Sequence, residues 1–281
     1  MTEMWELLLR SRKFITGSVV VGVIVMFGII GPLVTRDANK KDWTKMGLPP
    51  SNEYLLGTTA FGEDVLAQLC LGIRNSLLVG AIAGALGTFL AILLGALGAY
   101  KGGWTDEISS FVTNIIIVFP VLPLLIILAA VMEQRSLIVV GVLIALTTWP
   151  WAARSIRSQV LSLKEREFVN LARMSGMKDR TTVITEVLPN MLAYIIMVFV
   201  LLVGGAILAE AGISMIGVGP AGTVTLGQML WFAMNQTLKA HWWDMWWWFI
   251  PPGLVLTVFL SAVFVVHAGM EELFNPRLRT V

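Results

Sequence analysis

Residues 187–209 read VLPNMLAYIIMVFVLLVGGAILA, a run of 23 residues that contains no charged side chain. A helix needs about 20 apolar residues to cross the hydrocarbon core of a bilayer, and this run is long enough. Lipid offers no hydrogen-bond partners to the backbone, whereas a helix satisfies its N–H and C=O groups internally. The run therefore predicts a transmembrane helix.

Five further runs without a charge surround this one, so we expect about six transmembrane helices. They are residues 14–35, 75–100, 108–132, 136–153 and 245–270. The composition agrees, because 57% of the 281 residues are hydrophobic and 14% are charged, with a mean hydropathy of +0.80. A soluble domain has about 25% charged residues. The expected fold class is an all-α membrane protein with a single domain.

The first run could be mistaken for a secretory signal peptide, because Arg10, Arg12 and Lys13 form a basic flank before it. The apolar part of a signal peptide is roughly 7–15 residues long and ends at a pattern of small residues. Residues 14–35 form a longer run, and no such pattern ends it. We therefore expect a retained first transmembrane helix.

The distribution of lysine and arginine predicts the orientation, because these residues are enriched in cytoplasmic loops. With the N-terminus in the cytoplasm, 13 of the 20 fall inside and 7 fall outside. This predicts a multi-pass protein of the cell (inner) membrane with both termini cytoplasmic. The expected segments are a cytoplasmic N-terminus at 1–13, a first helix at 14–35, an extracytoplasmic loop at 36–74, a membrane core at 75–270 that includes a cytoplasmic loop at 157–190, and a cytoplasmic tail at 271–281.

The cytoplasmic loop predicts two short helices joined at a glycine. In the first helix, Phe168, Leu171 and Ser175 share one face. Gly176 suits the end of this helix, where a positive φ is needed. Asp179 suits the N-cap of the second helix. An amphipathic helix outside the bilayer buries its apolar face against something, and both the groove of a partner protein and the lipid headgroups remain possible.

Small residues are frequent in the second span, where Gly80 and Gly84 are four residues apart, as are Ala91 and Gly95. Small residues let transmembrane helices approach closely. The pattern fits either a helix of a translocation core or partner interface, or ordinary packing within the chain.

Candidate gate or pathway residues lie toward the outer side. Glu210 ends the fifth span within apolar sequence, and an ionisable group in a span is a functional candidate, although a wet position near the interface would weaken this interpretation. Ser214 follows one turn later, and residues 229–238 suggest a short amphipathic helix on the outer surface. Six tryptophans crowd this end, and they fit either an aromatic belt or a surface that stacks on sugar rings or on a binding protein. They are Trp231, Trp242, Trp243, Trp246, Trp247 and Trp248.

The cytoplasmic loop also resembles a known motif. Asn170-Leu171-Ala172, Gly176 and Leu188-Pro189 have the spacing of the E-A-A loop of binding-protein-dependent ABC importers, and Ala172, Gly176, Leu188 and Pro189 match it strictly. Glu167-Phe168 and Arg173 match the variant in the dipeptide/oligopeptide/nickel permeases. Further segments similar to that subfamily lie at 56–77, 149–157, 210–219 and 275–278. The end of the last span, residues 266–272, departs from the Gly-Asp-Gly-rich pattern of the peptide permeases.

The resemblance implies a type I ABC importer permease, the second of two paired permeases. It implies a heterodimer with the other permease, two ATP-binding subunits that hold ATP and Mg, and an extracytoplasmic solute-binding protein, with no cofactor on this chain. Nucleic acid is not an expected partner, because the formal net charge is only +2. The substrate would be a di- or oligopeptide or an oligosaccharide. The residues of the ATPase-coupling loop would be Glu167, Phe168, Leu171, Ala172, Arg173, Gly176, Leu188 and Pro189, and the possible gate or pathway residues Glu210, Ser214 and Trp247.

Two features weigh against other functions. The sequence contains no G-x-x-x-x-G-K-[ST] motif, so energy from ATP would have to come from another chain. A stand-alone secondary transporter or channel should carry ionisable residues in mid-membrane or inverted repeats, and apart from Glu210 and His267 the spans show neither. A scaffold subunit of a membrane complex is the remaining alternative. His241 and His267 show no metal-binding spacing, and no metal is expected.

Overall fold

The computed structural model describes residues 11–236 and 242–274, and within these ranges the chain is built from helices and loops. Five helices are long and apolar enough to cross a membrane: α2 (Arg12–Val34), α3 with its continuation (Val65–Lys101), α7 (Leu137–Lys164), α11 (Leu192–Met215) and α13 (Trp246–Phe274). A bent pair, α5 (Gly103–Val118) and α6 (Val121–Val131), supplies a sixth span. The predicted all-α fold with about six spans is confirmed.

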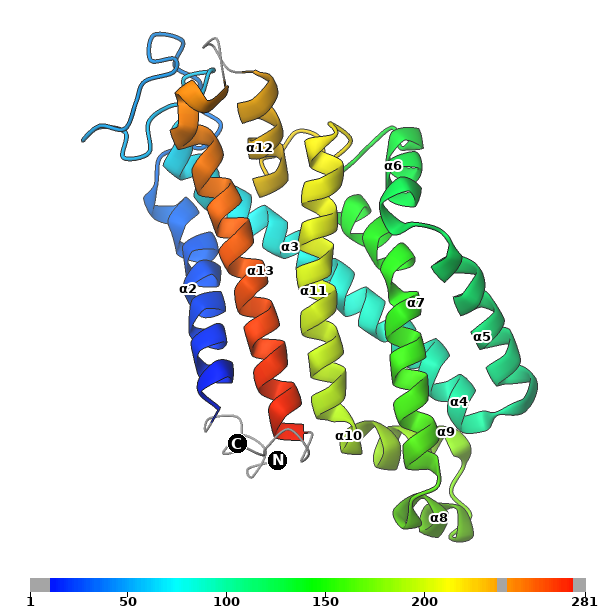
Figure 1. Cartoon of the computed structure of the whole chain (residues 1–281). Coiled ribbons are helices and arrows are strands. Elements are labelled where there is room, and N and C mark those ends of the chain that lie inside the picture. Colours follow the sequence, from blue (N-terminus) through cyan, green and yellow to red (C-terminus); the bar gives the residue numbers. More distant parts are fainter. Residues whose placement is uncertain (1–10, 237–241, 275–281) are drawn as a thin grey trace.

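The helices form one bundle (Figure 1). α2 packs against α13 at one edge, and α3 crosses the bundle diagonally in contact with α2, α7 and α11. The pair α5 and α6 packs against α7 at the opposite edge. α12 (Leu226–Asn235) and residues 36–64 lie at one end of the bundle, which we call the α12 end. α8 (Glu167–Met174) lies at the other, the α8 end, as do the first residues of α2 and the last residues of α13.

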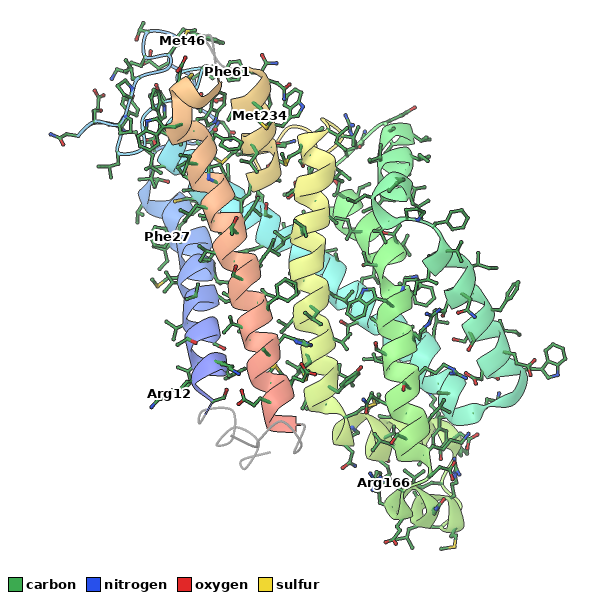
Figure 2. All side chains as sticks on the ribbon, in the orientation of Figure 1. Arg12, Phe27, Met46, Phe61, Arg166 and Met234 are labelled. Atoms are coloured by element: carbon green, nitrogen blue, oxygen red, sulfur yellow. The ribbon has the colours of Figure 1, made fainter. Side chains whose placement is uncertain are left out.

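Apolar side chains cover the outside of the bundle. On α2, Phe27, Ile29 and Leu33 are 51%, 60% and 78% exposed, and Phe27 points away from the neighbouring helices (Figure 2). Helix surfaces of this kind are stable when lipid covers them. The outer surface therefore agrees with a multi-pass membrane protein.

α3 begins earlier than the charge pattern predicts. The helix starts at Val65, ten residues before the expected start at 75. The Asp64 side chain caps it by accepting hydrogen bonds from the N–H groups of Leu66 and Ala67, at 2.9 and 3.3 Å. The charge of Arg74, which is exposed, does not end the helix. A π-helical turn, η1 (Ile92–Ala96), and α4 (Leu97–Lys101) continue it.

The third span is two helices rather than the single helix expected over 108–132. α5 and α6 meet at 85°. Proline lacks the N–H that would continue the helix, and it disfavours the helical conformation of the residue before it. Phe119, directly before Pro120, is extended with ψ at 130°. The bend therefore follows from Pro120.

Glycines in and after α3 serve close packing inside the chain. A Cβ at Gly84 would lie 2.5 Å from the Val203 side chain in α11. A Cβ at Gly95 would lie 2.5 Å from the carbonyl oxygen of Ala153 in α7. Of the two interpretations of the small residues, internal packing accounts for these positions.

Candidate functional site

The predicted loop between the fourth and fifth spans forms a protrusion that ends the molecule at the α8 end (Figure 1). α8 begins at Glu167 and is closed by a Schellman motif. In this motif the N–H of Met177 donates to the Ala172 carbonyl at 3.2 Å, and the N–H of Gly176 donates to the Arg173 carbonyl at 3.0 Å. Gly176 has a φ of +79°, so the predicted positive φ is confirmed.

The second half of the protrusion leads directly into α11. α9 (Asp179–Thr182) continues through a π-helical turn, η2 (Val183–Val187), into α10 (Leu188–Asn190). The N-cap of α9 is Lys178, so the prediction of Asp179 as N-cap was wrong by one residue. Asp179 stands in the first turn instead, where its negative charge complements the helix dipole. Pro189 stands in the first turn of α10, as an exposed residue.

One face of α8 is buried in the chain and another is open. Val169 and Ala172 are 0% and 6% exposed and pack toward the protein. The Phe168 side chain is half-buried and packs against the apolar cluster that contains Val169. Leu171 and Met174 are 61% and 77% exposed. Of the predicted face of Phe168, Leu171 and Ser175, only Leu171 is a large apolar side chain that is exposed. The exposed apolar surface of α8 therefore lies around Leu171 and Met174 instead.

The open face of α8 consists of Glu167, Leu171 and Met174, at positions i, i+4 and i+7. All three side chains are exposed, so this surface combines two large apolar groups with a carboxylate. We call it the open face of α8. Leu188, also predicted for the coupling loop, is half-buried in the cluster behind α8.

Arg173 connects α8 to the second span. Its Nε donates to the hydroxyl of Tyr100 at 3.1 Å, and its guanidinium carbon lies 4.9 Å from the centre of the Tyr100 ring. The Nζ of Lys164 lies 6.0 Å from the same ring. Tyr100 is in α4, so the hydrogen bond and the cation–π contacts connect three segments of the chain.

At the α12 end, Glu210 lies at the centre of a second group, which contains one further predicted residue, Ser214. The side chain of Glu210 is fully buried, so of the two alternatives for this residue a solvent-exposed position is excluded. Oε1 accepts hydrogen bonds from the hydroxyls of Ser214 and Thr225, both at 2.6 Å. Oε2 accepts one from the hydroxyl of Ser76 at 3.1 Å. We call Ser76, Glu210, Ser214 and Thr225 the Glu210 cluster.

Backbone groups orient two of these hydroxyls. The Ser76 oxygen accepts from the N–H of Leu226 at 3.1 Å, and the Thr225 oxygen accepts from the N–H of Gln228 at 3.2 Å. Their own hydrogens are therefore available to Glu210. Thr225 is the N-cap of α12, so the cluster attaches α12 to α3 and α11. Because Leu226, Met229, Leu230 and Ala233 are buried, α12 packs into the bundle and does not lie on its outer surface.

Trp247 also lies inside the protein. It is 5% exposed, and its Nε1 donates to the carbonyl of Thr58 at 3.1 Å. Trp248 is 1% exposed, whereas Trp246 is 50% exposed. Neither Trp247 nor Trp248 forms part of an exposed belt or stacking surface. His241 and the side chains of Trp242 and Trp243 lie outside the described residues, as do residues 275–278 of the predicted motif.

The segment at 36–64 covers this end of α13 and carries its own ionic contacts. Asp42 accepts hydrogen bonds from the N–H of Thr44 at 3.0 Å and from its hydroxyl at 2.6 Å, and these hold the pKa of Asp42 below its ordinary value. Lys45 contacts Glu53, which raises the pKa of the lysine. Both groups are partly open to solvent, so they add little to stability.

Comparison with known proteins decides the family. A model of the family described as "Binding-protein-dependent transport system inner membrane component" matches residues 87–280. This range contains both the protrusion and Glu210. The chain belongs to this family. It is the permease subunit of a binding-protein-dependent ABC importer, and the predicted resemblance is confirmed.

Individual relatives of the permease align over most of its length. The oligopeptide transport system permease protein OppC of Mycobacterium tuberculosis is 30% identical over 252 residues, which cover 89% of the permease and 85% of the relative. OppC of Bacillus subtilis is 30% identical over 274 residues, covering 96% and 88%. The dipeptide transport system permease protein DppC of Bacillus subtilis is 28% identical over 279 residues, covering 99% and 86%.

Three residues of the permease that organise these sites were not predicted. Thr225 had a usable signal, since a threonine three residues before a glutamine is typical of a helix start. No local pattern marks the contacts of Tyr100 and Ser76, because their partners Arg173 and Glu210 are 73 and 134 residues away in the sequence. The structure packs Phe168 and Leu188 against the same apolar cluster, and leaves Trp247 apart from Glu210 and Ser214.

Proposed function

We propose that the permease forms half of the translocation pathway of an importer for di- or oligopeptides. The other half would come from a second permease, and a solute-binding protein would deliver the substrate at the α12 end. Three relatives that align with most of the chain are named as oligopeptide or dipeptide permeases, which supports a peptide substrate. The burial of Trp247 and Trp248 weakens the alternative of stacking on sugar rings.

Two ATP-binding subunits would lie at the α8 end, on the cytoplasmic side, and would bind the ATP and Mg. The excess of lysine and arginine at this end supports the orientation. Both termini would then be cytoplasmic, because α2 begins and α13 ends at the α8 end (Figure 1).

Docking of an ATP-binding subunit is inferred chiefly from the open face of α8. Leu171 and Met174 are exposed, as is Glu167 on the same face. Their helix α8 stands outside the membrane bundle, and Arg166 directly precedes it (Figure 2). Full burial of such a side chain in a partner groove contributes about 1.5–3 kcal/mol. An apolar helix face that enters a groove is a recurrent mode of protein recognition.

The attachments of α8 make it suited to transmit movement. Val169 and Ala172 are packed against the chain, and Arg173 contacts Tyr100 at the end of the second span. A displacement of α8 by a partner would therefore reach α4 directly, and α11 through the continuous segment from α9. In this mechanism, ATP binding would bring the ATP-binding subunits together, move the protrusion and open the pathway outward.

Substitution of Leu171 tests the docking. In the complete importer, Leu171→Glu is expected to reduce the ATP-binding subunits that co-purify with the permease by about tenfold or more, and to abolish ATP-driven peptide uptake, because it places a charge in an apolar groove. Leu171→Met keeps an apolar side chain of similar size and serves as the matched control. Normal retention and uptake in the Leu171→Glu importer would refute docking through this face. Uptake is measured with di- to hexapeptides and with oligosaccharides of similar mass.

A further inference from the structure

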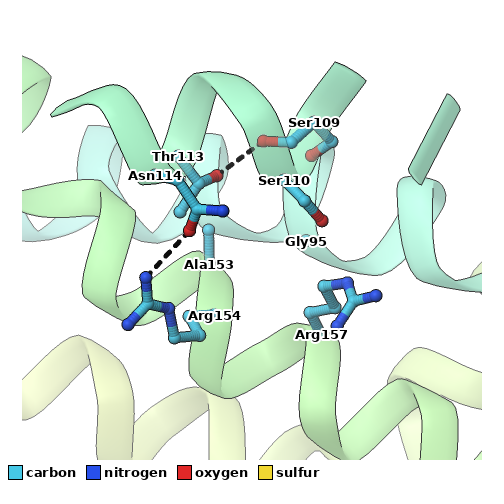
Figure 3. A pocket seen from close by; sticks show the side chains of 8 residues that line it. All are labelled: Gly95, Ser109, Ser110, Thr113, Asn114, Ala153, Arg154 and Arg157. Carbon is cyan, nitrogen blue, oxygen red and sulfur yellow. Dashed lines mark hydrogen bonds between the residues drawn. The ribbon is translucent and has the colours of Figure 1, made fainter. Parts of the chain in front are cut away.

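A polar pocket of about 290 Å³ lies between α5, the π-helical turn η1 and α7 (Figure 3). It is separate from the open face of α8 and from the Glu210 cluster. Arg154 and Arg157 are on α7, ten and seven residues before its end at Lys164, so the pocket is in the half of the bundle nearer to α8. Its lining consists of Gly95, Ser109, Ser110, Thr113, Asn114, Ala153, Arg154 and Arg157.

The charges in this pocket do not cancel. Arg157 forms a bidentate pair with Asp106, with Nε–Oδ1 and Nη2–Oδ2 distances of 2.7 Å each. Asp106 is thereby neutralised. Arg154 donates one hydrogen bond to the Asn114 side-chain oxygen at 2.9 Å (Figure 3), and it has no ion pair in residues 11–236 and 242–274. One positive charge remains uncompensated.

The groups left free in the pocket are hydrogen-bond donors. The hydroxyls of Ser109 and Thr113 already donate to the carbonyls of Leu94 and Ser109, at 2.6 and 2.8 Å. The buried Ser110 hydroxyl makes no hydrogen bond of ordinary geometry within the described part of the chain, and it lies close to the Asp106 carboxylate. Arg154 retains four of its five N–H groups, and its contact occupies only the oxygen of Asn114. Donors around a single positive charge select an anion.

The depth of the pocket matches the boundary between the hydrocarbon and the headgroups. α7 starts at Leu137 at the α12 end, and Arg154 and Arg157 lie about 25 and 30 Å further along at 1.5 Å per residue. The hydrocarbon core of a bilayer is about 30 Å thick. Both guanidiniums therefore lie near the level of the lipid phosphates in the leaflet on the α8 side.

An apolar stripe runs along the face of α5 that points away from most of the pocket lining. Trp104, Ile108, Phe111 and Ile115 follow the helical repeat at i, i+4, i+7 and i+11, and are 80%, 59%, 65% and 46% exposed. Tryptophan is enriched at the level of the headgroups, and Trp104 stands in the first turn of α5 at that end. The outer face of α5 is therefore suited to contact lipid chains on the α8 side.

We propose that this pocket binds the phosphate of an anionic phospholipid in the leaflet on the α8 side. Arg154 provides the charge and most of the donors, and Ser110 and Asn114 provide further hydrogen bonds. Basic pockets between transmembrane helices on the cytoplasmic side bind lipid headgroups in this way. A bound lipid would hold α5 against α7 next to the bend at Pro120.

Native mass spectrometry of the full-length permease tests the site. Phosphatidylglycerol is titrated into the detergent-purified protein, with phosphatidylcholine as the neutral comparison. Arg154→Gln is expected to weaken the retention of phosphatidylglycerol about tenfold, the effect of losing a charge-assisted hydrogen bond, and Arg154→Lys to weaken it less. Arg12→Gln removes the same charge from an exposed position at the same end, on the opposite edge of the bundle, and is expected to leave retention unchanged.

Three outcomes would overturn the lipid site. Equal retention of phosphatidylglycerol by Arg154→Gln and the unsubstituted permease would show that the pocket does not hold the lipid. Displacement of the lipid by millimolar inorganic phosphate would identify a site for free phosphate. A raised KM for peptide uptake in the Arg154→Gln importer, with lipid retention unchanged, would assign the pocket to the carboxylate of the substrate.

Discussion

Glu210 shows how strongly a single buried residue can be constrained. Its two oxygens receive three hydroxyl hydrogens, from Ser76, Ser214 and Thr225. A carboxylate only accepts, so it satisfies all three donors. The position of Glu210 in an apolar run marked it as a functional candidate. Its hydrogen bonding could not be predicted, because Ser76 and Thr225 come close to it only in the folded chain.

Glu210→Gln is expected to destabilise the permease although the two side chains have the same shape. The amide NH₂ would point hydrogens at a hydroxyl that also donates, and an unsatisfied buried donor costs about 1–3 kcal/mol. The midpoint of thermal unfolding of the purified permease should fall by several degrees. Glu271→Gln, at an exposed position of α13, is the control and should leave the midpoint unchanged. Equal midpoints for both variants would show that the Glu210 cluster does not stabilise α12.

At the scale of elements, hydropathy predicted the spans because lipid requires long apolar helices. It did not predict where those helices bend or begin. The bend after Val118 depends on Pro120, which lies in the middle of an apolar run, and the start of α3 depends on the Asp64 cap. The end of α8 was predictable, since the Schellman motif requires a positive φ and glycine adopts it readily, as Gly176 does here.

Gly176→Ala is expected to loosen the protrusion. The space around Gly176 is open, because no neighbouring atom lies within 4 Å of the position that a Cβ would occupy, so the effect comes from the backbone. A left-handed conformation costs a residue with a Cβ about 1–2 kcal/mol. Limited proteolysis should cleave residues 167–190 faster, and ATP-driven uptake should fall. Gly22→Ala in α2, where the space is also open and φ is helical, should change neither, and equal proteolysis of the two variants would contradict the role of Gly176.

At the scale of the whole molecule, the permease presents two different surfaces at its two ends. The α12 end is closed over by residues 36–64, α12 and the buried Trp247 and Trp248. The α8 end carries a projecting helix with an open face. The sequence predicted the projection at the α8 end, because the loop at 157–190 has helix signals and the residue spacing of the E-A-A loop. It did not predict which face of α8 is open, because Val169 is covered by distant parts of the chain.

The most direct measurement is photocrosslinking from position 171 in native membranes. A photoreactive amino acid is placed at Leu171 and, as the control, at Phe27 on the lipid-facing surface of α2. We expect position 171 to crosslink to a protein that carries a G-x-x-x-x-G-K-[ST] motif, and position 27 not to do so. Crosslinks from position 171 to lipid alone would contradict the central claim that the open face of α8 docks on an ATP-binding subunit.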